Sequence, residues 1–386
     1  MTRRIRILGT MVGSLKKKDM QVKYGTLIDS INQLFDLVEI CDASLKGIDK
    51  YINAISNFSP HISSWKEKYF KNISAFTRRS KKIQTFVTAH RDEMDVILQI
   101  GGLFNSTTDS AGVPVVIYTD NTTRITSRHP HSGRFLFSGN DFEKWVSLEK
   151  ELYQNAAHIC VRSNITKLSL MKDYEIGEEK ITVIGGGVNF KELPEKFDKT
   201  PGSKFRVLFI GTDFYRKGGD LVINAFKKFL EKHPDSELTI VTKDSISTHY
   251  TMPGVVIKKP IWNRFEIKNL YLSADVFILP SRFETWGDVL LEAMAYGLPC
   301  ISVYGQPMEE IIIHGETGFL VQPENENELS AAINDLAQNP ELRERMGEAA
   351  RKLVSEKYTW ERVVDRLAPI IYEAANNYFY QPITNI

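Results

Sequence analysis

Two glutamates are the residues of this sequence whose type and spacing indicate chemistry most directly. Seven residues separate Glu284 from Glu292, and Glu292 lies within a mostly apolar stretch, residues 288–296. Such a stretch predicts a buried helix, in which a carboxylate needs a hydrogen-bonding partner. A ribose diol is a suitable partner, because an ionised carboxylate can accept from both hydroxyls. Glu284 can accept from hexose hydroxyls in the same way.

The peptide groups that follow Glu284 form part of the same candidate site. They begin the predicted helix, so their N–H groups can face an oxygen-rich ligand. These groups belong to Thr285, Trp286 and Gly287. The alternative is that Glu284 is a solvent-facing loop residue and Glu292 an interior ion-pair partner. Composition alone favours neither interpretation.

A glycine-rich basic turn, residues 211–220, follows another predicted strand. Gly211 ends the strand, Arg216 and Lys217 are adjacent cations, and two glycines lead into a helix. Cations beside a glycine-rich turn at a helix start can hold a diphosphate. The alternative is an exposed basic turn, which is common. The position of this turn after a strand favours diphosphate binding, because open α/β sheets bind ligands at the carboxyl ends of their strands.

Two positions in the first half of the chain are further candidates. Gly13 follows a predicted strand at residues 5–12 and would let a backbone approach a phosphate closely. Asp120 follows a predicted strand at residues 115–118 and could orient an acceptor hydroxyl or act as a base. Because Asp also favours helix caps and turns, capping is the slightly favoured alternative for Asp120.

Several familiar nucleotide and metal motifs are absent from the sequence. It contains no GxGxxG, no P-loop GxxxxGK[ST], no DxD and no HExxH. A dinucleotide or P-loop site is therefore disfavoured, and we expect no bound metal and no cofactor. If a diphosphate leaves from this site, Arg and Lys must stabilise its charge in place of a divalent cation.

The elements that position these residues follow from the apolar pattern. Short continuous apolar runs alternate with helical stretches in both halves. This predicts an α/β fold in which each half is a doubly wound domain with a parallel sheet covered on both faces. The predicted strands are residues 5–12, 37–40, 96–100, 115–118, 158–161, 181–184, 205–210, 238–241, 255–257, 276–279, 301–303 and 319–321. The predicted helices include residues 25–35, 142–156, 220–230, 264–273, 288–296 and 308–314.

The join between the two domains is predicted near three consecutive glycines, which a charged, proline-containing stretch follows. We expect an N-terminal domain at residues 1–186, a linker at 187–203 and a C-terminal domain at 204–360. The last amphipathic segment, residues 360–380, is expected to be a helix that packs back onto the N-terminal domain.

Composition bounds the class of protein. The chain has 386 residues, 42% of them hydrophobic, and a formal net charge of +1. These values suit two sizeable cores and give no support to nucleic-acid binding. Three cysteines stand far apart, and no apolar run is long enough to span a membrane. We therefore expect a reduced, cytoplasmic protein.

One basic segment stands apart, residues 65–82, in which lysines and arginines are interleaved with aromatic residues. A solvated, charged helix face is the more common meaning of such a pattern. The alternative is a basic amphipathic surface that rests on anionic lipid headgroups, at the inner membrane face, or receives an anionic acceptor.

Taken together, these motifs resemble those of a known family. Residues 281–297 resemble the Glu-x7-Glu signature of the retaining glycosyltransferases of family four, which have the GT-B fold. Residues 211–220 look like that family's phosphate-binding segment, and residues 311–321 like its downstream glycine turn. Residues 183–190 look like its interdomain segment. The resemblance is strong over roughly residues 155–365 and covers residues 1–150 only in outline.

The resemblance implies two Rossmann-like domains that face a central cleft. It also implies transfer of a hexose from a UDP- or GDP-linked donor to a hydroxyl of a glycan, lipid or small molecule, with retained configuration and without metal. Glu292 would hold the ribose and Glu284 the transferred sugar, while Arg216 and Lys217 would bind the diphosphate. In the first domain, Gly25 would begin the first helix and approach the donor, in preference to Gly13. Base contacts would come from the backbone around Lys258 and Ile261.

Two departures from the family pattern concern the catalytic residues. Thr212 stands where many members have an arginine, so Arg216 must carry more of the phosphate charge. Asp120 stands where many have a histidine near the acceptor. Two other functions remain open: a GT-B sugar-nucleotide epimerase or hydrolase, and a non-catalytic sugar-nucleotide-binding protein. The intact set of acids and cations argues against the second.

Overall fold

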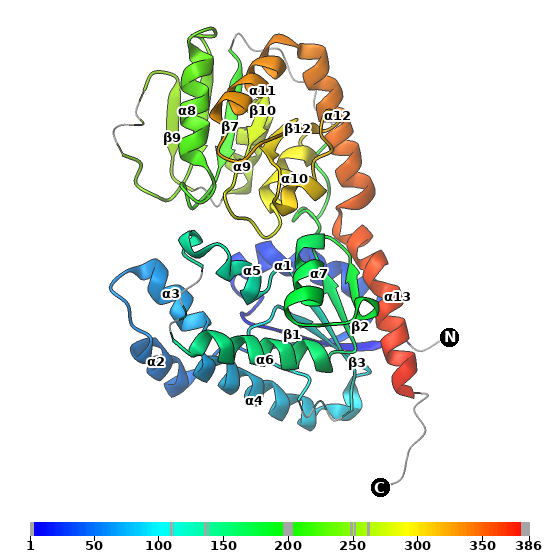
Figure 1. Ribbon diagram of the computed structural model, residues 1–386. Helices are drawn as coiled ribbons and strands as arrows, with labels where there is room; N and C mark the ends of the chain where they lie inside the picture. Colours follow the sequence, from blue (N-terminus) through cyan, green and yellow to red (C-terminus); the bar gives the residue numbers. More distant parts are fainter. Residues whose placement is uncertain are drawn as a thin grey trace. The chain divides into compact units, whose positions relative to one another are not determined.

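The chain divides into two units, each built around its own parallel sheet (Figure 1). The first unit runs to Gly185 and resumes at Trp360, and the second runs from Gly186 to Thr359. The computed structural model describes residues 4–379 except 109, 111, 135, 136, 138, 196–203, 248, 249, 251, 261 and 262. Ile261, one of the predicted base contacts, and the end of the predicted linker lie outside the described residues.

The sheet of the first unit has six parallel strands in the order β2-β1-β3-β4-β5-β6. These strands are β1 (Arg6–Met11), β2 (Asp36–Asp42), β3 (Val96–Ile100), β4 (Val115–Thr119), β5 (His158–Val161) and β6 (Ile181–Val183). The helices are α1 (Lys18–Leu34), α2 (Gly47–Ser56), α3 (Ile62–Phe70), α4 (Ile73–Ala89), α5 (Thr123–Ser127), α6 (Asp141–Asn155), α7 (Asn164–Asp173) and α13 (Trp360–Phe379). Short 3-10 turns are η1 (Arg91–Glu93), η2 (Pro130–Ser132) and η3 (Glu178–Lys180).

Both faces of this sheet are covered, because successive side chains of a strand point to opposite faces. In β3, Val96 and Leu98 join a buried cluster with α1 and α13. Ile97, between them, joins a second cluster with α4, α6 and α7. The continuous apolar runs of the sequence are thus strands buried on both sides. At the start of α13, Trp360 is buried and packs edge-on against Tyr118 of β4.

The sheet of the second unit also has six parallel strands, in the order β12-β11-β10-β7-β8-β9. They are β7 (Arg206–Ile210), β8 (Glu237–Val241), β9 (Val255–Lys258), β10 (Val276–Ile278), β11 (Cys300–Val303) and β12 (Gly318–Val321). The helices are α8 (Gly219–Leu230), α9 (Arg264–Ser273), α10 (Asp288–Ala295), α11 (Glu326–Gln338) and α12 (Pro340–Lys357), with a 3-10 turn, η5 (Pro307–Glu310). The central strand pair is β7 and β10, so the segments that follow these two strands leave the same edge of the sheet.

The predicted α/β fold class is confirmed, and each of the twelve predicted strands overlaps an observed one. The first helix is longer than predicted. It begins at Lys18, and Gly25 lies inside it, so the prediction that Gly25 starts this helix is wrong. The apolar residues Met20 and Tyr24 already pack against the core upstream of Gly25.

The predicted helix at residues 308–314 is also wrong, since only the 3-10 turn η5 forms there. Ile313 shows the reason. Its N–H donates to the side-chain Oγ1 of Thr317 at 2.9 Å, and a donor used in this way cannot continue an α-helical ladder. His314 instead bridges to Gly318 at the start of β12.

Two glycines inside helices give opposite expectations for substitution by alanine. A Cβ on Gly347 of α12 would lie 2.1 Å from the carbonyl oxygen of Gly297, whereas on Gly25 its nearest contact is Gln21 Cγ at 3.5 Å. Gly347→Ala should lower the free energy of unfolding by about 1–3 kcal/mol through overpacking. Gly25→Ala should raise it by up to about 1 kcal/mol. Urea titration followed by circular dichroism measures both, and equal effects of the two variants would contradict the packing described.

Candidate functional site

The candidate site is built on the loops that follow the adjacent strands β7 and β10. The loop after β7 spans residues 211–218 and the loop after β10 spans residues 279–287. The Arg282 N–H donates to the carbonyl oxygen of Arg216 at 2.9 Å, which ties the loops together. Gly218 makes this close approach possible: its φ is +77°, and a Cβ there would lie 2.3 Å from the carbonyl oxygen of Pro280.

An ion pair between Lys217 and Glu284 joins the two loops through their side chains. The side chains are only 13% and 11% exposed. Burial pushes the pKa of Glu284 upward, but the charges of Lys217 and Arg216 and hydrogen bonds to the carboxylate outweigh it and lower the pKa. Glu284 is therefore ionised at neutral pH, and the interpretation of Glu284 as a solvent-facing loop residue is wrong.

The backbone around Glu284 is also held in place. Its N–H donates to Gln306 Oε1 at 3.1 Å, and the Thr285 N–H donates to Glu284 Oε1 at 3.2 Å. The loop that contains Gln306 follows β11, the strand beside β10. Three neighbouring strands thus contribute to the orientation of one carboxylate.

Arg216 lies beside this ion pair, and its side chain is 9% exposed. Its Nε donates to Asp213 at 2.8 Å and its Nη1 to the carbonyl oxygen of Phe283 at 2.7 Å. The interpretation of residues 211–220 as an exposed basic turn is therefore wrong for both cations. Within the described part of the chain, the Nη2 group of Arg216 has no partner, so the guanidinium keeps donors that an anion could use.

Arg282 is a residue of this site that the sequence did not indicate. It makes two-pronged pairs with Asp220 (2.7 and 2.8 Å) and with Glu324 (2.8 and 2.9 Å). Hydrogen bonds to these carboxylates raise the pKa of Arg282 above its usual range. Arg282 also donates to the carbonyl oxygen of Tyr215 at 2.6 Å. It fixes the start of α8 against the loop after β10, as only a guanidinium fork can.

Glu292 lies in α10, and its carboxylate accepts a hydrogen bond from the hydroxyl of Tyr271 at 2.9 Å. Tyr271 is fully buried and stacks on Tyr296, with ring centroids 5.1 Å apart and planes at 13°. Burial and the neighbouring Glu292 charge raise the pKa of Tyr271 well above its ordinary value, so its hydroxyl keeps its proton and donates. Tyr271 and Leu270 are buried residues of the amphipathic helix α9, and this apolar face was the only sequence signal for Tyr271.

The remaining residues predicted in this unit lie as follows. Gly287 is the N-cap of α10 with a φ of +113°. Trp286 is buried against Tyr358, and within the described residues its Nε1 has no hydrogen-bond partner. A Cβ on Gly211 would lie 2.7 Å from Phe209 Cζ. Lys258 ends β9, is exposed, and accepts with its carbonyl oxygen from the Thr242 N–H at 3.0 Å.

Gly13, Gly25 and Asp120 belong to the other unit. Gly13 has a φ of +119°, and its N–H already donates to Asp42 Oδ1 at 2.9 Å. Asp120 follows β4, as predicted, but the N-cap of α5 is Thr122, so the capping interpretation of Asp120 is wrong for this helix. Its carbonyl oxygen accepts from Thr166 Oγ1 at 3.1 Å.

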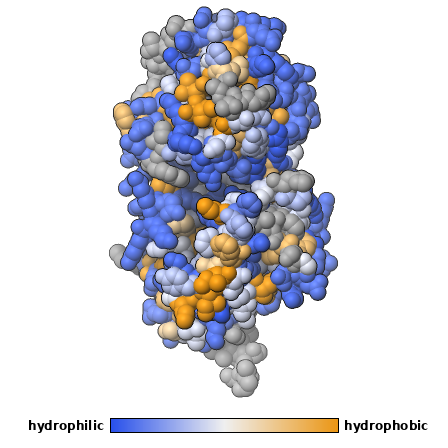
Figure 2. Space-filling view, turned by 90° about the vertical axis from the view of Figure 1, so that its left-hand side faces the viewer, coloured by the Kyte–Doolittle hydropathy of each residue, from blue (hydrophilic) through white to orange (hydrophobic). Residues whose placement is uncertain are grey.

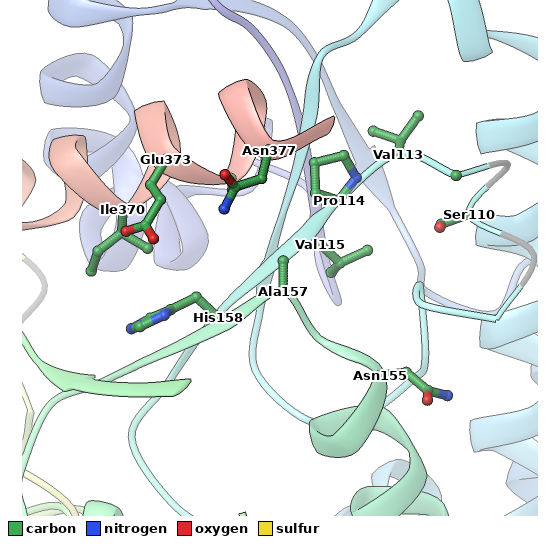
Figure 3. A pocket seen from close by; sticks show the side chains of 12 residues that line it. Ser110, Val113, Pro114, Val115, Asn155, Ala157, His158, Ile370, Glu373 and Asn377 are labelled. Carbon is green, nitrogen blue, oxygen red and sulfur yellow. The ribbon is translucent and has the colours of Figure 1, made fainter. Parts of the chain in front are cut away.

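A cavity of about 300 Å³ in the first unit lies away from the carboxyl edge of its sheet (Figure 3). It is lined by residues that precede or begin β4 and β5, including Pro114 and His158, and by Glu373 and Asn377 of α13. Because ligands of such sheets bind at the opposite edge, this cavity is not the candidate site. Among the described residues, no group of three His, Cys, Asp or Glu side chains could hold a metal ion.

Residues 190–353 match the model of the family described as glycosyl transferases group 1. An uncharacterized glycosyltransferase of Methanocaldococcus jannaschii is 30% identical over 229 residues, which cover 55% of this chain and 58% of that protein. The capsular polysaccharide biosynthesis glycosyltransferase CapM of Staphylococcus aureus is 25% identical over 352 residues, 86% of this chain and 88% of CapM. The first match therefore spans little more than half the length of that relative.

Solved structures share the fold. Sucrose-phosphate synthase from Thermosynechococcus elongatus has a TM-score of 0.69 and 17% identity, covering 97% of this chain and 100% of that one. Anabaena HepE in complex with UDP and glucose has a TM-score of 0.63 and 17% identity, covering 96% of this chain and 100% of HepE. Both agree with the α/β arrangement of two parallel sheets.

The Lys217–Glu284 pair predicts a pH dependence of stability. Because the folded-state pKa of Glu284 is lowered, the pair stabilises the fold above the usual Glu pKa, and this stabilisation is lost as the pH falls through the lowered value. Lys217→Met should lower the free energy of unfolding at pH 7 by about 2 kcal/mol, since it leaves a largely buried carboxylate unpaired. The difference in the free energy of unfolding between the wild type and Lys217→Met should shrink below about pH 4.

Urea titrations at several pH values measure this difference. The control is Lys227→Met, which changes an exposed lysine of α8 and should leave stability unchanged at every pH. A deficit for Lys217→Met that does not vary with pH would contradict the ion pair as described.

Proposed function

We propose that this chain, whose residues 190–353 match the glycosyl transferases group 1, is an enzyme of that family that moves a hexose from a nucleoside-diphosphate sugar to an acceptor hydroxyl. The observation that carries the proposal is the buried Lys217–Glu284 pair with Arg216 beside it, at the carboxyl edge of a doubly wound sheet. Two cations and an ionised carboxylate lie close together in space here. They can bind a ligand that carries a diphosphate next to a sugar, the cations binding the diphosphate and the carboxylate the sugar hydroxyls.

Lys217 and Arg216 are proposed to bind the diphosphate. As the bond to the sugar breaks, negative charge develops on the leaving diphosphate, and fixed cations in a largely buried site stabilise it. Arg216 is already oriented by Asp213 and Phe283, so little reorganisation is needed. We propose on this basis that transfer requires no bound metal and no cofactor. That the donor sugar keeps its anomeric configuration is proposed from the resemblance to the retaining family alone.

Glu284 and Glu292 are proposed to bind the two sugars of the donor. Glu284, kept ionised by Lys217, accepts from hydroxyls of the transferred hexose, with the peptide groups of Thr285 to Gly287 beside it. Glu292 accepts from the ribose hydroxyls. Tyr271 holds one oxygen of this carboxylate and so sets its direction. A neutral donor at 2.9 Å achieves this without neutralising the charge that the ribose hydroxyls need.

The identities of base and acceptor are finer proposals. UDP is the base-bearing group in the complex of HepE, and we propose a UDP- or GDP-linked hexose here, with base contacts near Lys258. Gly211 is proposed to let the backbone approach the diphosphate. In the other unit, Asp120 is the proposed acceptor-side residue. The acceptor is a hydroxyl of a glycan, lipid or small molecule, and the enzyme is proposed to act in the cytoplasm at the inner membrane face.

A single assay tests the proposed reaction and the role of the cations. The protein is mixed with UDP- and GDP-hexoses, a panel of acceptors and EDTA, and the release of free nucleotide is followed. We expect acceptor-dependent release, reduced about 100-fold or more by Arg216→Ala and by Lys217→Ala, the scale of one lost transition-state charge contact. The control Lys227→Ala should retain the full rate.

The other outcomes of this assay overturn the proposal. A free nucleotide sugar that changes its sugar without acceptor indicates an epimerase, and acceptor-independent release indicates a hydrolase. Binding without any turnover indicates a non-catalytic protein. Near wild-type rates in both variants would remove Arg216 and Lys217 from the mechanism.

The ribose assignment makes a separate prediction for donor affinity. Glu292→Ala should weaken binding of the nucleotide sugar by roughly 1.5–3 kcal/mol, the value of hydrogen bonds to a charged group. Tyr271→Phe should weaken it less and leave the rate at saturating donor almost unchanged, as expected of a positioning residue. Both losses should nearly vanish for a donor with a 2′,3′-dideoxyribose, as calorimetry can show. A full loss with that analogue would refute the ribose contact.

A further inference from the structure

The exposed apolar side chains of this protein are concentrated in one short segment. Of the fifteen large apolar side chains that are exposed among the described residues, six lie between residues 48 and 62. Four of them face outward from α2 at helical spacing, so this helix presents an apolar stripe to solvent. Three are among the most exposed, with Ile48 at 74%, Ile55 at 76% and Ile62 at 79%. The full set is Ile48, Tyr51, Ile52, Ile55, Phe58 and Ile62.

This apolar stripe is held outward by polar contacts on the inner side of the helix. Asn53, the one buried residue of α2, donates to the carbonyl oxygen of Tyr69 at 2.9 Å and accepts from Asn72 at 3.0 Å. Trp65 Nε1 donates to the carbonyl oxygen of Ala54 at 2.8 Å. Burying the stripe against the unit would break these bonds, so its exposure is fixed by the fold. Figure 2 looks onto the side that carries α2 and α3 and shows a hydrophobic patch on this unit.

The longer stretch that contains this segment, residues 46–82, is strongly basic. Residues 46–82 contain nine Lys or Arg and two Asp or Glu, a net charge of +7, so the rest of the chain carries −6. Both acidic residues are paired, Asp49 with Arg78 and Glu67 with Arg134. Exposed lysines flank the apolar stripe at positions 46, 50, 66 and 81. A charge of this size next to exposed apolar side chains is complementary to an anionic lipid surface.

The structure changes the extent of the basic surface expected at residues 65–82. Arg79 is buried, with Nη1 donating to the carbonyl oxygen of Phe70 at 2.7 Å, and Lys82 Nζ donates to the carbonyl oxygen of Ser44 at 3.0 Å. These two cations hold the fold and do not face a ligand. The apolar half of the surface lies upstream, in α2 and the loop that follows it.

We propose that α2 and the start of α3 form a peripheral membrane-binding surface. The apolar side chains of residues 48–62 enter the boundary between headgroups and acyl chains, and Lys46, Lys50 and Lys66 contact lipid phosphates. A protein partner fits less well, since the cores of protein interfaces are depleted of lysine. Among the described residues no helix is long and apolar enough to cross a membrane, so the contact is one of docking. The inference rests on the proposed function in one respect: it assigns the acceptor to the membrane surface.

Sedimentation with vesicles tests this surface. The full chain is mixed with vesicles of phosphatidylcholine, alone or with phosphatidylglycerol. We expect binding only to the anionic vesicles, weakened by salt. Combining Ile48→Ser, Ile55→Ser and Ile62→Ser should reduce partitioning on the order of 100-fold or more, since each buried apolar side chain contributes about tenfold. Combining Lys46→Glu, Lys50→Glu and Lys66→Glu should reduce it by a similar factor, at about fivefold or more per charge.

Matched controls separate this surface from general effects. Leu168→Ser removes an exposed apolar side chain of α7, and Lys172→Glu reverses an exposed charge of the same helix; both should bind as the wild type does. Wild-type partitioning of either triple variant overturns the proposal. It is also overturned if the wild-type chain forms a dimer in the absence of lipid and the triple isoleucine variant does not. Donor affinity of the same variants, measured without lipid, should be unchanged, so failure here is distinct from failure of the proposed donor site.

Discussion

The buried pairing of Lys217 with Glu284 is the interaction on which the candidate site depends. A carboxylate and an ammonium group that are mostly removed from water must compensate each other, because either one alone is costly to bury. This requirement explains why the backbone around the pair is held in place by several contacts. Gly218 allows the two loops to meet, the Arg282 backbone joins them, and Gln306 holds the Glu284 backbone from a third strand. The charges that a diphosphate and a sugar need are thus present before a ligand arrives, which is the basis of preorganised catalysis.

The second carboxylate is stabilised by a different chemistry. Glu292 is bound by a buried tyrosine hydroxyl, which lowers the cost of placing a charge in an apolar helix but does not neutralise it. Glu284 is thus held by a cation, and Glu292 accepts a hydrogen bond from a neutral hydroxyl. This difference matches the two partners proposed for them, a sugar next to a diphosphate and a ribose remote from it.

The sequence predicted the strands well and the pairings poorly. Short apolar runs such as Val96–Ile100 predict strands buried on both faces, and in the structure successive side chains of this strand enter different cores. It also predicted which residue types follow β7 and β10. The partners were beyond reach, since Lys217 and Glu284 are 67 residues apart and Tyr271 and Glu292 are 21 apart. No prediction was made for α2, whose periodic apolar face points to solvent, and the period alone does not say whether such a face is buried.

The central claim is that a nucleotide sugar binds to the loops after β7 and β10. Amide hydrogen exchange, measured by mass spectrometry with and without UDP-glucose or GDP-mannose, tests it most directly. The account predicts slower exchange in residues 211–218 and 283–292 when the donor is present, with no change at the cavity near His158. Unchanged exchange in both segments at a saturating donor concentration, or slowing confined to that cavity, would contradict it.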